Sequence, residues 1–578
     1  MPVDEIHPGM EGVGRTVFEG DTIEEFRVEI LGILKNAIGP QEDMILARLH
    51  GDRIEYTGVV AGMSGSPVYI DGRLVGAVAY RIGSFAKEPI AGITPIASML
   101  RLADAPARGV SEQPRPPDLL GRFLGTANGG VLIPTAGESP TPLPALQSTA
   151  SAGGQMEPIG TPLICTGCDA GVLRYYAPIF EAHGLQPMTG GGVSEEASLL
   201  PLEPGSPIAA ALALGDLAMT GVGTLTAMDE DRILAFGHPV LGTGPIEVPM
   251  TQAEVLLTFA SEAGSFKVAN ATRPIGSFVR DGLTGVVGRI GRSAPTIPVD
   301  VHVSSPAGER SFHYRVLDNR SWSPVLIAVT TANSLVRTTE YDAGAALGLK
   351  YRISLEGYPD VLVEEIFSGT SPTQPVHLAL ANAAGGLFGV LHNNRFETPR
   401  MLGARVDVEV LPENRVAVIK SLSVSRTRVR PGQTIRVMAV LKPYRGESRT
   451  VVWDVKIPED MPRGDARIVV GSGPAINSLE RQVLQRRISQ AGSLTDLIAL
   501  LESRRRNSAL YLSLSRRSPS AVVRTDVLSD LPLSIFSVFN SPRLSSDATL
   551  MFRAPVLELE RDLDLVVVGG RRISVKVQ

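Results

Sequence analysis

The chain has 578 residues, too many for one hydrophobic core, and this length predicts roughly three to five domains. Charged residues make up 20% and hydrophobic residues 43%, which is the composition of a folded soluble protein. The net charge of −5 gives no electrostatic case for nucleic-acid binding. No uncharged apolar stretch of roughly 18 residues is present, so the sequence predicts no transmembrane segment.

The N-terminal sequence "MPVDEIHPGMEG" lacks the basic and apolar regions of a secretory signal. Two alternatives stay open at this point. The protein is cytosolic, or it is exported and its signal peptide lies outside this chain.

The first hundred residues are dominated by β patterns. The segments "RVEILGILKN" (27–36) and "MILARLHG" (44–51) alternate like strands. The runs 67–70 and 73–80 flank Asp71-Gly72, a favoured two-residue turn, and therefore predict a hairpin. The segment "ITPIASMLRLA" (93–103) is typical of a short helix that closes this region.

Residues 105–160 are rich in Pro, Gly, Ser and Ala and predict a linker. The compact segment after it contains a predicted helix around 175–184 and the two cysteines of the chain, Cys165 and Cys168. A metal site usually needs four ligands, no second pair exists, and no helix of thioredoxin type clearly follows. We interpret the pair as structural, either reduced or locally bridged, with a zinc or redox role as the alternative.

The region 204–292 returns to a β pattern. Two strands flank the turn "MDEDR" (228–232), and a glycine-rich loop then holds His238. The segment 250–261 is compatible with a helix or a strand. A helix is expected at 323–339, an immunoglobulin-like sandwich from about 415 to 470, and an amphipathic helix at 493–506 with Ser493 as its N-cap.

The hexapeptide "GMSGSP" (62–67) has two interpretations. It is a tight turn in a β-rich protein, or it is the loop of a serine nucleophile. Gly62 and Gly65 flank Ser64, and glycine permits backbone angles that aim successive N–H groups at one point. If Ser64 attacks a carbonyl, the N–H groups of Gly62 and Ser64 are the natural donors to the oxyanion.

A serine nucleophile needs a base, and His238 is the best of the eight histidines. It lies between Gly237 and Pro239 in a loop that follows a strand, where the alternative is a histidine that caps a turn. An acid is needed to fix the imidazole tautomer. Asp52 is weakly preferred for this role.

The rival aspartates are Asp43, Asp71 and Asp229. The last two are better explained by the turns in which they lie. Asp52 lies twelve residues before Ser64 (64 − 52), close to a strand end.

The segment "GMSGSPVYIDGRLVGAVAY", with "FEGDTIEEFRVEILGIL" before it, resembles the nucleophile-bearing half of the SpoIVB-type serine peptidases. The segments "GVGTLTAMDEDRILAFGHPVLGTG" and "GSFVRDGLTGVVGRIG" resemble the histidine-bearing half. The resemblance implies Ser64 as nucleophile and His238 as general base. The family acid lies shortly before the serine, where this sequence offers Asp52, while His50 falls near the same place.

The resemblance implies a chymotrypsin-like fold of two β-barrels with the site in the cleft between them. In the sporulation protease for which the family is named, the histidine half comes first. In this chain Ser64 precedes His238 by 174 positions (238 − 64), which is the order of a circular permutation. Triads recur in different chain orders, so the order is acceptable.

The sequence therefore predicts a mainly β protein: a chymotrypsin-like double β-barrel assembled from two chain segments, a C-terminal immunoglobulin-like β-sandwich and small α/β accessory regions. The expected divisions are a serine-bearing half at 1–103, a linker at 104–160, a connecting segment at 161–203, a histidine-bearing half at 204–292, an accessory α+β domain at 293–414, the sandwich at 415–480 and a C-terminal α+β region at 481–578.

Two functions follow from these features. The first is a serine endopeptidase that cleaves protein or peptide substrates by an acyl-enzyme route, without cofactor or metal. The second is an inactive, peptidase-like scaffold that binds a partner. Similar long chains look like bacterial envelope proteins, which implies export to the cell envelope and an envelope partner for the C-terminal domains.

Overall fold

The computed structural model describes residues 1–82, 88–105, 156–190, 201–262, 264–338, 345–369, 375–479, 491–523, 526–528, 530–539 and 548–578. The protein is mainly β and divides into two compact units. Unit 1 holds the described residues up to Pro298 together with His313–Trp322, and unit 2 holds Val299–Phe312 and the described residues from Ser323 onward. The predicted linker lies largely outside the described residues, which resume at Met156.

A closed six-stranded barrel forms the N-terminal part of unit 1. Its strands pair in the order β4-β1-β2-β3-β6-β5, and β4 also pairs with β5, which closes the ring. Alternate residues of β1 are buried, as expected for a strand with one face on a core. The strands and the short helices beside them are β1 (Glu11–Thr16), β2 (Glu24–Gly39), β3 (Glu42–His50), β4 (Pro67–Ile70), β5 (Arg73–Ile82), β6 (Ile90–Pro95), η1 (Val3–Glu5), α1 (Asp52–Thr57) and α2 (Ile96–Asp104).

The predicted hairpin is confirmed as β4 and β5. Ile70 pairs with Arg73, so the loop has two residues. Asp71 has φ 49° and Gly72 has φ 74°, and two positive φ values are what a type I′ turn requires. The hairpin begins directly after "GMSGS" and therefore supports the candidate serine loop from its C-terminal side.

A second set of strands in unit 1 also pairs in a ring. The order is β10-β13-β14-β15-β12-β11, and β10 pairs with β11 as well. The ambiguous segment 250–261 belongs mostly to strand β13. These strands are β10 (Pro207–Gly215), β11 (Ala218–Asp229), β12 (Arg232–Ala235), β13 (Gly244–Phe259), β14 (Phe266–Gly282) and β15 (Gly285–Ile290).

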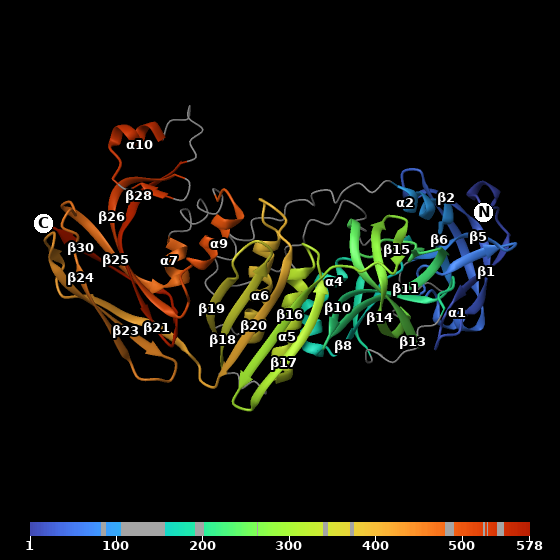
Figure 1. Ribbon diagram of the computed structural model, residues 1–578, viewed down its shortest axis with the longest axis horizontal. Coiled ribbons are helices and arrows are strands. Elements are labelled where there is room, and N and C mark those ends of the chain that lie inside the picture. The colour runs from blue at the N-terminus through green and yellow to red at the C-terminus, as the bar shows by residue number, and fades with distance from the viewer. Residues whose placement is uncertain are drawn as a thin grey trace. The chain divides into compact units, whose positions relative to one another are not determined.

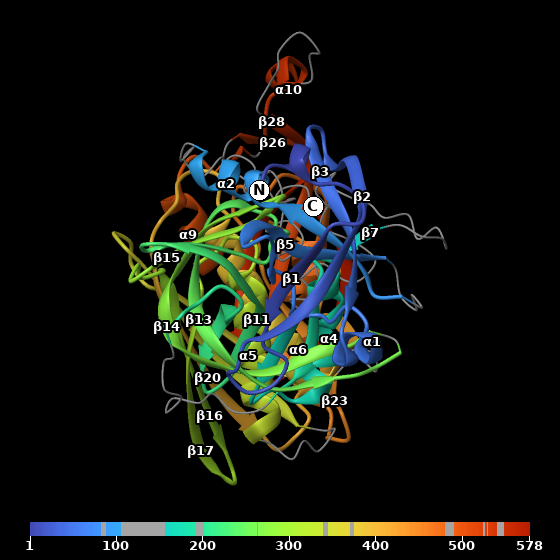
Figure 2. The same cartoon turned by 90° about the vertical axis from the view of Figure 1, so that its right-hand side faces the viewer.

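The two sets of strands share buried side chains. Ala77 of β5 and Met99 of α2 pack in one cluster with Leu234 of β12 and Val287 of β15. In Figure 1 the first set, in blue, lies beside the green strands β11, β13, β14 and β15, and Figure 2 shows α2 near β5 and β15. Segments that are far apart in the sequence therefore form one core.

Three further strands and one helix complete the central part of unit 1. The strand β7 (Met156–Pro158) pairs with β5, and β8 (Thr161–Thr166) pairs with β11 and β9 (Leu185–Thr189). The predicted helix near 175–184 is α4 (Ala170–Glu181), whose N-cap Asp169 accepts hydrogen bonds from two backbone N–H groups.

Unit 2 begins with an α/β layer. The predicted helix at 323–339 is confirmed as α5, and it packs against α6. β16 pairs in parallel with β20, and β18 lies between β20 and β19. These elements are α5 (Ser323–Thr338), β18 (Ala346–Leu355), β19 (Val361–Ser368), α6 (Val376–His392) and β20 (Met401–Leu411), and both β16 (Thr296–Ser305) and β17 (Gly308–Leu317) have residues in the two units.

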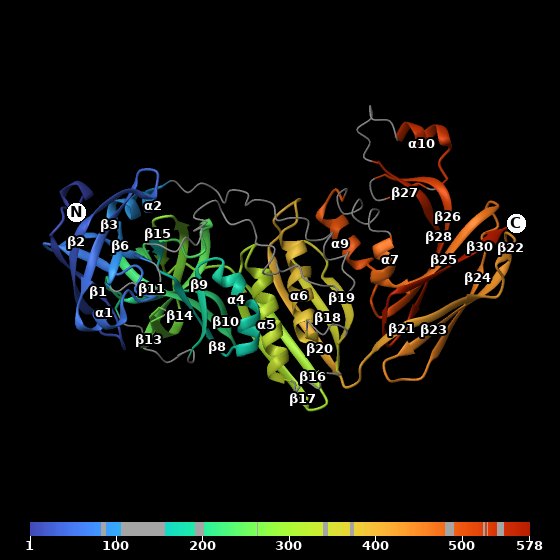
Figure 3. The same ribbon diagram turned by 180° about the vertical axis from the view of Figure 1, so that it is seen from behind.

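A β-sandwich forms the C-terminal part of unit 2 (Figure 3). One sheet has the order β24-β23-β21-β29, the other has β22-β30-β25-β26-β27 with β28 on β26, and both contribute to one core around Trp453. The second sheet takes strands from beyond residue 480. The elements are β21 (Val416–Val424), β22 (Arg428–Val429), β23 (Thr434–Pro443), β24 (Arg449–Lys456), β25 (Gly464–Ser472), α7 (Gly473–Leu479), α9 (Leu494–Glu502), β26 (Ala509–Val523), β27 (Asp526–Leu528), α10 (Leu533–Phe539), β28 (Ala548–Asp562), β29 (Val566–Val568) and β30 (Gly570–Val577).

The predicted cap of the amphipathic helix is confirmed, because the Ser493 side chain accepts a hydrogen bond from the N–H of Asp496 at the start of α9. Among the described residues, no helix combines the length and the apolar character that crossing a bilayer requires.

The contact between the serine loop and β11 leads to a first prediction. A Cβ built on Gly65, which has φ +99°, would lie 2.0 Å from Thr224 O and 2.6 Å from Phe236 N. Gly65→Ala should therefore lower the free energy of unfolding by more than about 2 kcal/mol, measured by urea denaturation. The matched control is Gly72→Ala, at φ +74° with no atom within 4 Å, which should cost about 1 kcal/mol. Equal losses would contradict the close approach.

Candidate active site

The loop of residues 60–66 is held by its own backbone and by β5. Met63 N–H donates to Val60 O, Ser66 N–H donates to Met63 O, and Gly65 N–H donates to Val78 O. Among the described residues, the N–H groups of Gly62 and Ser64 have no acceptor. They are the two groups that the sequence predicted as oxyanion donors, and their hydrogen-bonding capacity remains available for a ligand.

The structure distinguishes the two serines of the loop. The Ser66 hydroxyl donates to Met63 O at 2.6 Å, so its proton is already used within the loop. The Ser64 hydroxyl is fully buried and has no hydrogen-bond partner in the described part of the chain. A buried hydroxyl without a partner costs free energy, so Ser64 is the serine that needs a further explanation.

The carbonyl groups of the serine loop are held by β11. Thr224 N–H donates to Ser64 O at 2.8 Å, and the Thr224 hydroxyl donates to Gly62 O at 3.1 Å. The Thr226 hydroxyl donates to Gly65 O at 2.7 Å. The second set of strands therefore fixes the conformation of a loop that belongs to the first set.

His238 follows the end of β12, as the sequence predicted, on a loop with unusual backbone angles. Phe236 has φ 64° and Gly237 has φ 71°. Gly237 O accepts a hydrogen bond from the Thr94 hydroxyl at 2.6 Å, and a Cβ on Gly237 would lie 2.9 Å from Ala79 Cβ. The histidine loop therefore lies directly on β5 and β6 of the barrel.

Thr224 brings the serine and histidine loops together. Its N–H donates to Ser64 O and its carbonyl accepts from Phe236 N–H at 3.3 Å. The structure therefore places Ser64 and His238 on two loops that share one residue of β11. Their side chains are not hydrogen-bonded to each other, because Ser64 Oγ and His238 Nε2 are both without partners among the described residues.

The tautomer of His238 follows from its one hydrogen bond. The Nδ1 atom lies 2.8 Å from Pro239 O, and because a carbonyl oxygen only accepts, Nδ1 carries the proton. Nε2 therefore presents a lone pair, as a general base requires. Burial lowers the pKa of His238 to about 4, while the hydrogen bond to Pro239 acts in the opposite direction. The imidazole is neutral at pH 7.

Asp52 lies apart from this arrangement. It is exposed at the first position of α1, and no hydrogen bond or ion pair between the described residues joins it to His238. The rival aspartates are engaged elsewhere: Asp43 pairs with Lys35, Asp71 occupies the hairpin turn and Asp229 pairs with Arg232. The role of Asp52 as the acid stays a prediction.

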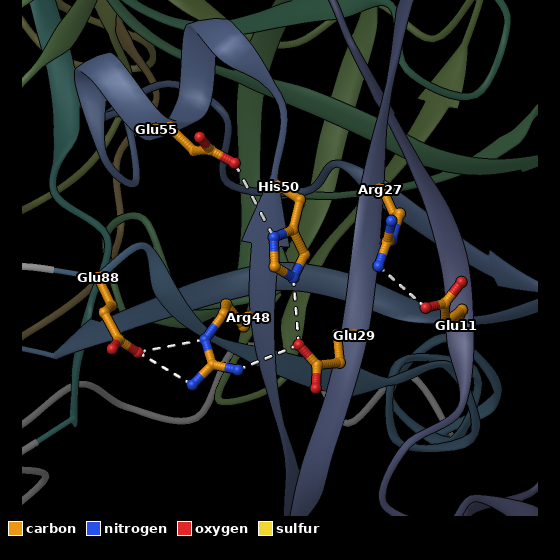
Figure 4. A network of polar contacts seen from close by, with 7 residues as sticks. All are labelled: Glu11, Arg27, Glu29, Arg48, His50, Glu55 and Glu88. Carbon is orange, nitrogen blue, oxygen red and sulfur yellow. Dashed lines mark hydrogen bonds and ion pairs between the residues drawn. The ribbon is translucent and has the colours of Figure 1, made fainter.

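His50, at the other place where the acid was expected, belongs to a polar network on β2 and β3 (Figure 4). Its Nε2 lies 3.1 Å from Glu29 Oε2, and Arg48 bridges Glu29 and Glu88. Hydrogen bonds from His50 and then Arg48 hold the pKa of Glu29 below its usual value. This explains His50 as a structural residue of the barrel exterior.

The comparison with known families bears on the same segment. Residues 3–99 match the family model described as SpoIVB peptidase S55. This segment is therefore similar to the SpoIVB peptidase domain. The match includes Ser64 and ends before the strands that lead to His238. No curated protein and no solved structure matches the chain.

A residue that the sequence pattern did not indicate also shapes the site. Asp281 of β14 is buried, and its carboxylate accepts from the N–H groups of Val240, Leu241 and Gly242 at 3.0, 2.5 and 2.8 Å. It therefore fixes the chain immediately after His238. The dipeptide Asp281-Gly282 has the sequence of a turn, which hid this role. Burial raises the pKa of Asp281 to about 6, against the effect of the three N–H groups.

The two cysteines are not joined to each other, and Cys165 is the more deeply buried of the two. Cys165 and Cys168 are both free, and burial raises the pKa of Cys168 to about 12 and raises that of Cys165 as well. The helix that follows the pair is α4, which begins at Ala170. Within the described residues, no group of three or more His, Cys, Asp and Glu side chains is arranged to hold a metal ion.

The burial of His238 predicts a loss of stability in acid. Between pH 6.5 and about 4 the unfolded chain binds a proton that the folded chain does not, so stability falls as the pH falls through this window. The shift corresponds to a loss on the order of 3 kcal/mol. The stability of His238→Gln relative to the wild type should rise by about this amount between pH 7.5 and 4.5, measured by urea denaturation, because the opposing contribution of Asp281 is common to both proteins.

The matched control for this measurement is His183→Gln, which changes an exposed histidine of the same unit. It should keep the pH dependence of the wild type. If His238→Gln loses as much stability in acid as the wild type, His238 is not a neutral buried imidazole.

Proposed function

We propose that unit 1 is a serine peptidase that cleaves polypeptide chains through Ser64 and His238. The observation that carries the proposal is a set of unpartnered groups on two loops that Thr224 joins. These are the Ser64 hydroxyl, Nε2 of His238, and the N–H groups of Gly62 and Ser64. The match of residues 3–99 to the SpoIVB peptidase family supports the same reaction class.

We further propose that the two rings of strands form a chymotrypsin-like double barrel with its halves in permuted order. Two rings of strands support this proposal. The first is the closed six-stranded barrel, and the second is the set β10 to β15, in which the last strand, β11, pairs with the first, β10. Ser64 belongs to the first ring and His238 to the second, as the two-barrel arrangement demands. The shared cluster of Ala77, Leu234 and Val287 accounts for their close packing.

The proposed reaction begins with attack of Ser64 Oγ on the peptide carbonyl. Nε2 of His238 takes the hydroxyl proton and then gives it to the leaving amine as the C–N bond breaks. The N–H groups of Gly62 and Ser64 receive the negative charge on the carbonyl oxygen. Water repeats the sequence on the acyl-enzyme, releasing the acid and restoring Ser64.

In this mechanism Pro239 O takes the orienting role that a carboxylate has in a Ser-His-Asp triad. It accepts the Nδ1 proton and so keeps Nε2 ready to accept another. A carbonyl is neutral and stabilises the imidazolium less than a carboxylate does, so the proposed site is a weak base with a slow acylation step. Asp52 could take over this role from Pro239 O only if its carboxylate moved to within hydrogen-bonding distance of His238 Nδ1.

A second candidate function is a peptidase-like scaffold that binds a partner without cleaving it. Its support is the burial of Ser64 at 0% and His238 at 2% exposure, because a buried nucleophile is closed to a substrate. Ala61 N–H donates to Ser265 O and Lys267 N–H donates to Ala61 O beside the serine. If the protein is a peptidase, the hydrogen bonds between Ala61 and β14 would have to break so that a substrate could reach Ser64.

The setting that we propose is the bacterial cell envelope, with protein substrates and with unit 2 as the part that binds an envelope partner. Its basis is the resemblance to long envelope chains and the separate β-sandwich core of unit 2. Recovery of the full-length natural protein from the cytosolic fraction alone would contradict this setting.

Covalent labelling tests the chemistry. A small fluorophosphonate should label the wild-type chain slowly, because Ser64 is buried, and mass spectrometry should place the label on Ser64. Ser64→Ala and His238→Ala should abolish labelling. The matched control is Ser66→Ala, which should keep it, since the Ser66 hydroxyl is bound to Met63 O. A wild type that is never labelled would favour the scaffold.

The same assay decides between the two orienting groups. If Pro239 O orients His238, the labelling rate of Asp52→Asn should stay within about threefold of the wild type. If Asp52 is the third member of a triad, the rate should fall by up to about 10⁴-fold. The second result would overturn the assignment to Pro239.

A further inference from the structure

Lys267 lies directly behind the loop that carries the oxyanion donors. It is the second residue of β14, and its N–H donates to Ala61 O at 2.9 Å. A Cβ on Gly62 would lie 3.2 to 3.4 Å from the Cβ, Cγ and Cδ atoms of Lys267. The aliphatic part of the lysine therefore covers one face of Gly62, two residues before Ser64.

Among the residues that the structure describes, the amino group of Lys267 has no charged partner. Only 1% of the residue is exposed, and Nζ donates to the Thr16 hydroxyl at 2.8 Å. The groups around it are neutral: Thr16 on β1, Thr258 opposite it on β13, and Ala61 and Gly62 of the loop. No ion pair within the described residues includes Lys267, and burial alone lowers its pKa to about 7.

An unpaired amine in this position destabilises the fold. Below pH 7 the ammonium is buried with one hydrogen bond, and a methionine of similar length would avoid that cost. The aliphatic stem that carries this amine touches the oxyanion loop, and a costly charge held beside that loop calls for a chemical role. Placing positive charge in a desolvated interior strengthens every interaction with a nearby negative charge.

We propose that Lys267 is a positioning residue for acyl transfer, whose ammonium group stabilises the negative charge that the Gly62 and Ser64 N–H groups receive. This inference rests on the proposed peptidase function. Lys267 transfers no proton and forms no bond to the substrate. It acts through the loop, since its stem packs on Gly62 and its backbone N–H holds Ala61.

The pH dependence of acylation distinguishes this role from a structural one. His238 must be neutral, which favours pH above about 4, and Lys267 must be charged, which favours pH below about 7. The rate should therefore pass through a maximum between these values and fall by about tenfold per unit on the alkaline side. A serine–histidine pair without Lys267 would keep its rate in the alkaline range.

The test is the rate of fluorophosphonate labelling at Ser64 of the full chain, measured from pH 4 to 9. Lys267→Met should lower the rate about tenfold or more at pH 6 and remove the alkaline decline. Thr16→Val removes the one acceptor of the ammonium and should move the decline to lower pH, while Thr16→Ser should keep it in place. The matched control Lys35→Met, which removes an exposed lysine of β2, should leave the profile unchanged.

Thermal unfolding separates charge from structural damage. Lys267→Met should melt at a higher temperature than the wild type at pH 6, because it removes an unpaired buried charge. If Lys267→Met does not fold, the test rests on the pH at which the labelling rate declines in Thr16→Val and in Thr16→Ser.

An alkaline decline that all these variants share with the wild type would overturn the inference and leave the peptidase proposal intact. The absence of Ser64 labelling at every pH would instead overturn the proposed function itself.

Discussion

Three polar groups of one buried residue, Thr224, hold the two loops of the candidate site together. Its N–H donates to Ser64 O, its carbonyl accepts from Phe236 N–H, and its hydroxyl donates to Gly62 O. A β-strand residue normally uses its N–H and carbonyl within a sheet. In β11 both groups of Thr224 serve residues of the two loops instead, one residue before Leu225, which pairs with Ala235 of β12.

The cost of this arrangement is a group of polar side chains in a dry interior. His238, Lys267 and Asp281 are all buried, and in each case burial shifts the pKa toward the neutral form. Such groups normally pair with one another. In this protein they take backbone or hydroxyl partners instead, which leaves Nε2 of His238 without one among the described residues. Electrostatic effects on a reacting carbonyl would be large in such a site, because buried charges are screened less than exposed ones.

Local patterns allowed much of the barrel and part of the site to be predicted from the sequence. Asp71-Gly72 predicted its hairpin turn, and the glycine before His238 predicted a loop at a strand end, because both depend on backbone preferences of adjacent residues. Asp281 and Lys267 were missed for the opposite reason. Their roles depend on partners 39 to 251 residues away, which no local pattern reports. The choice of Ser64 over Ser66 gained its physical reason only from the fold, in which the Ser66 hydroxyl is bound to Met63 O.

The burial of Ser64 and the role of Lys267 have a common origin in the pairing of β14 with the serine loop. Ala61 donates to Ser265 O and accepts from Lys267 N–H, so the residues that cover the loop also deliver the lysine to Gly62. Any movement that exposes Ser64 by separating Ser265 from Ala61 would act on Lys267 as well, because only Phe266 lies between Ser265 and Lys267. Water that reaches the ammonium would raise its pKa toward the ordinary lysine value and weaken its field at the same time. In the proposed peptidase, access for a substrate and electrostatic stabilisation of the oxyanion would therefore be coupled through one short segment of β14.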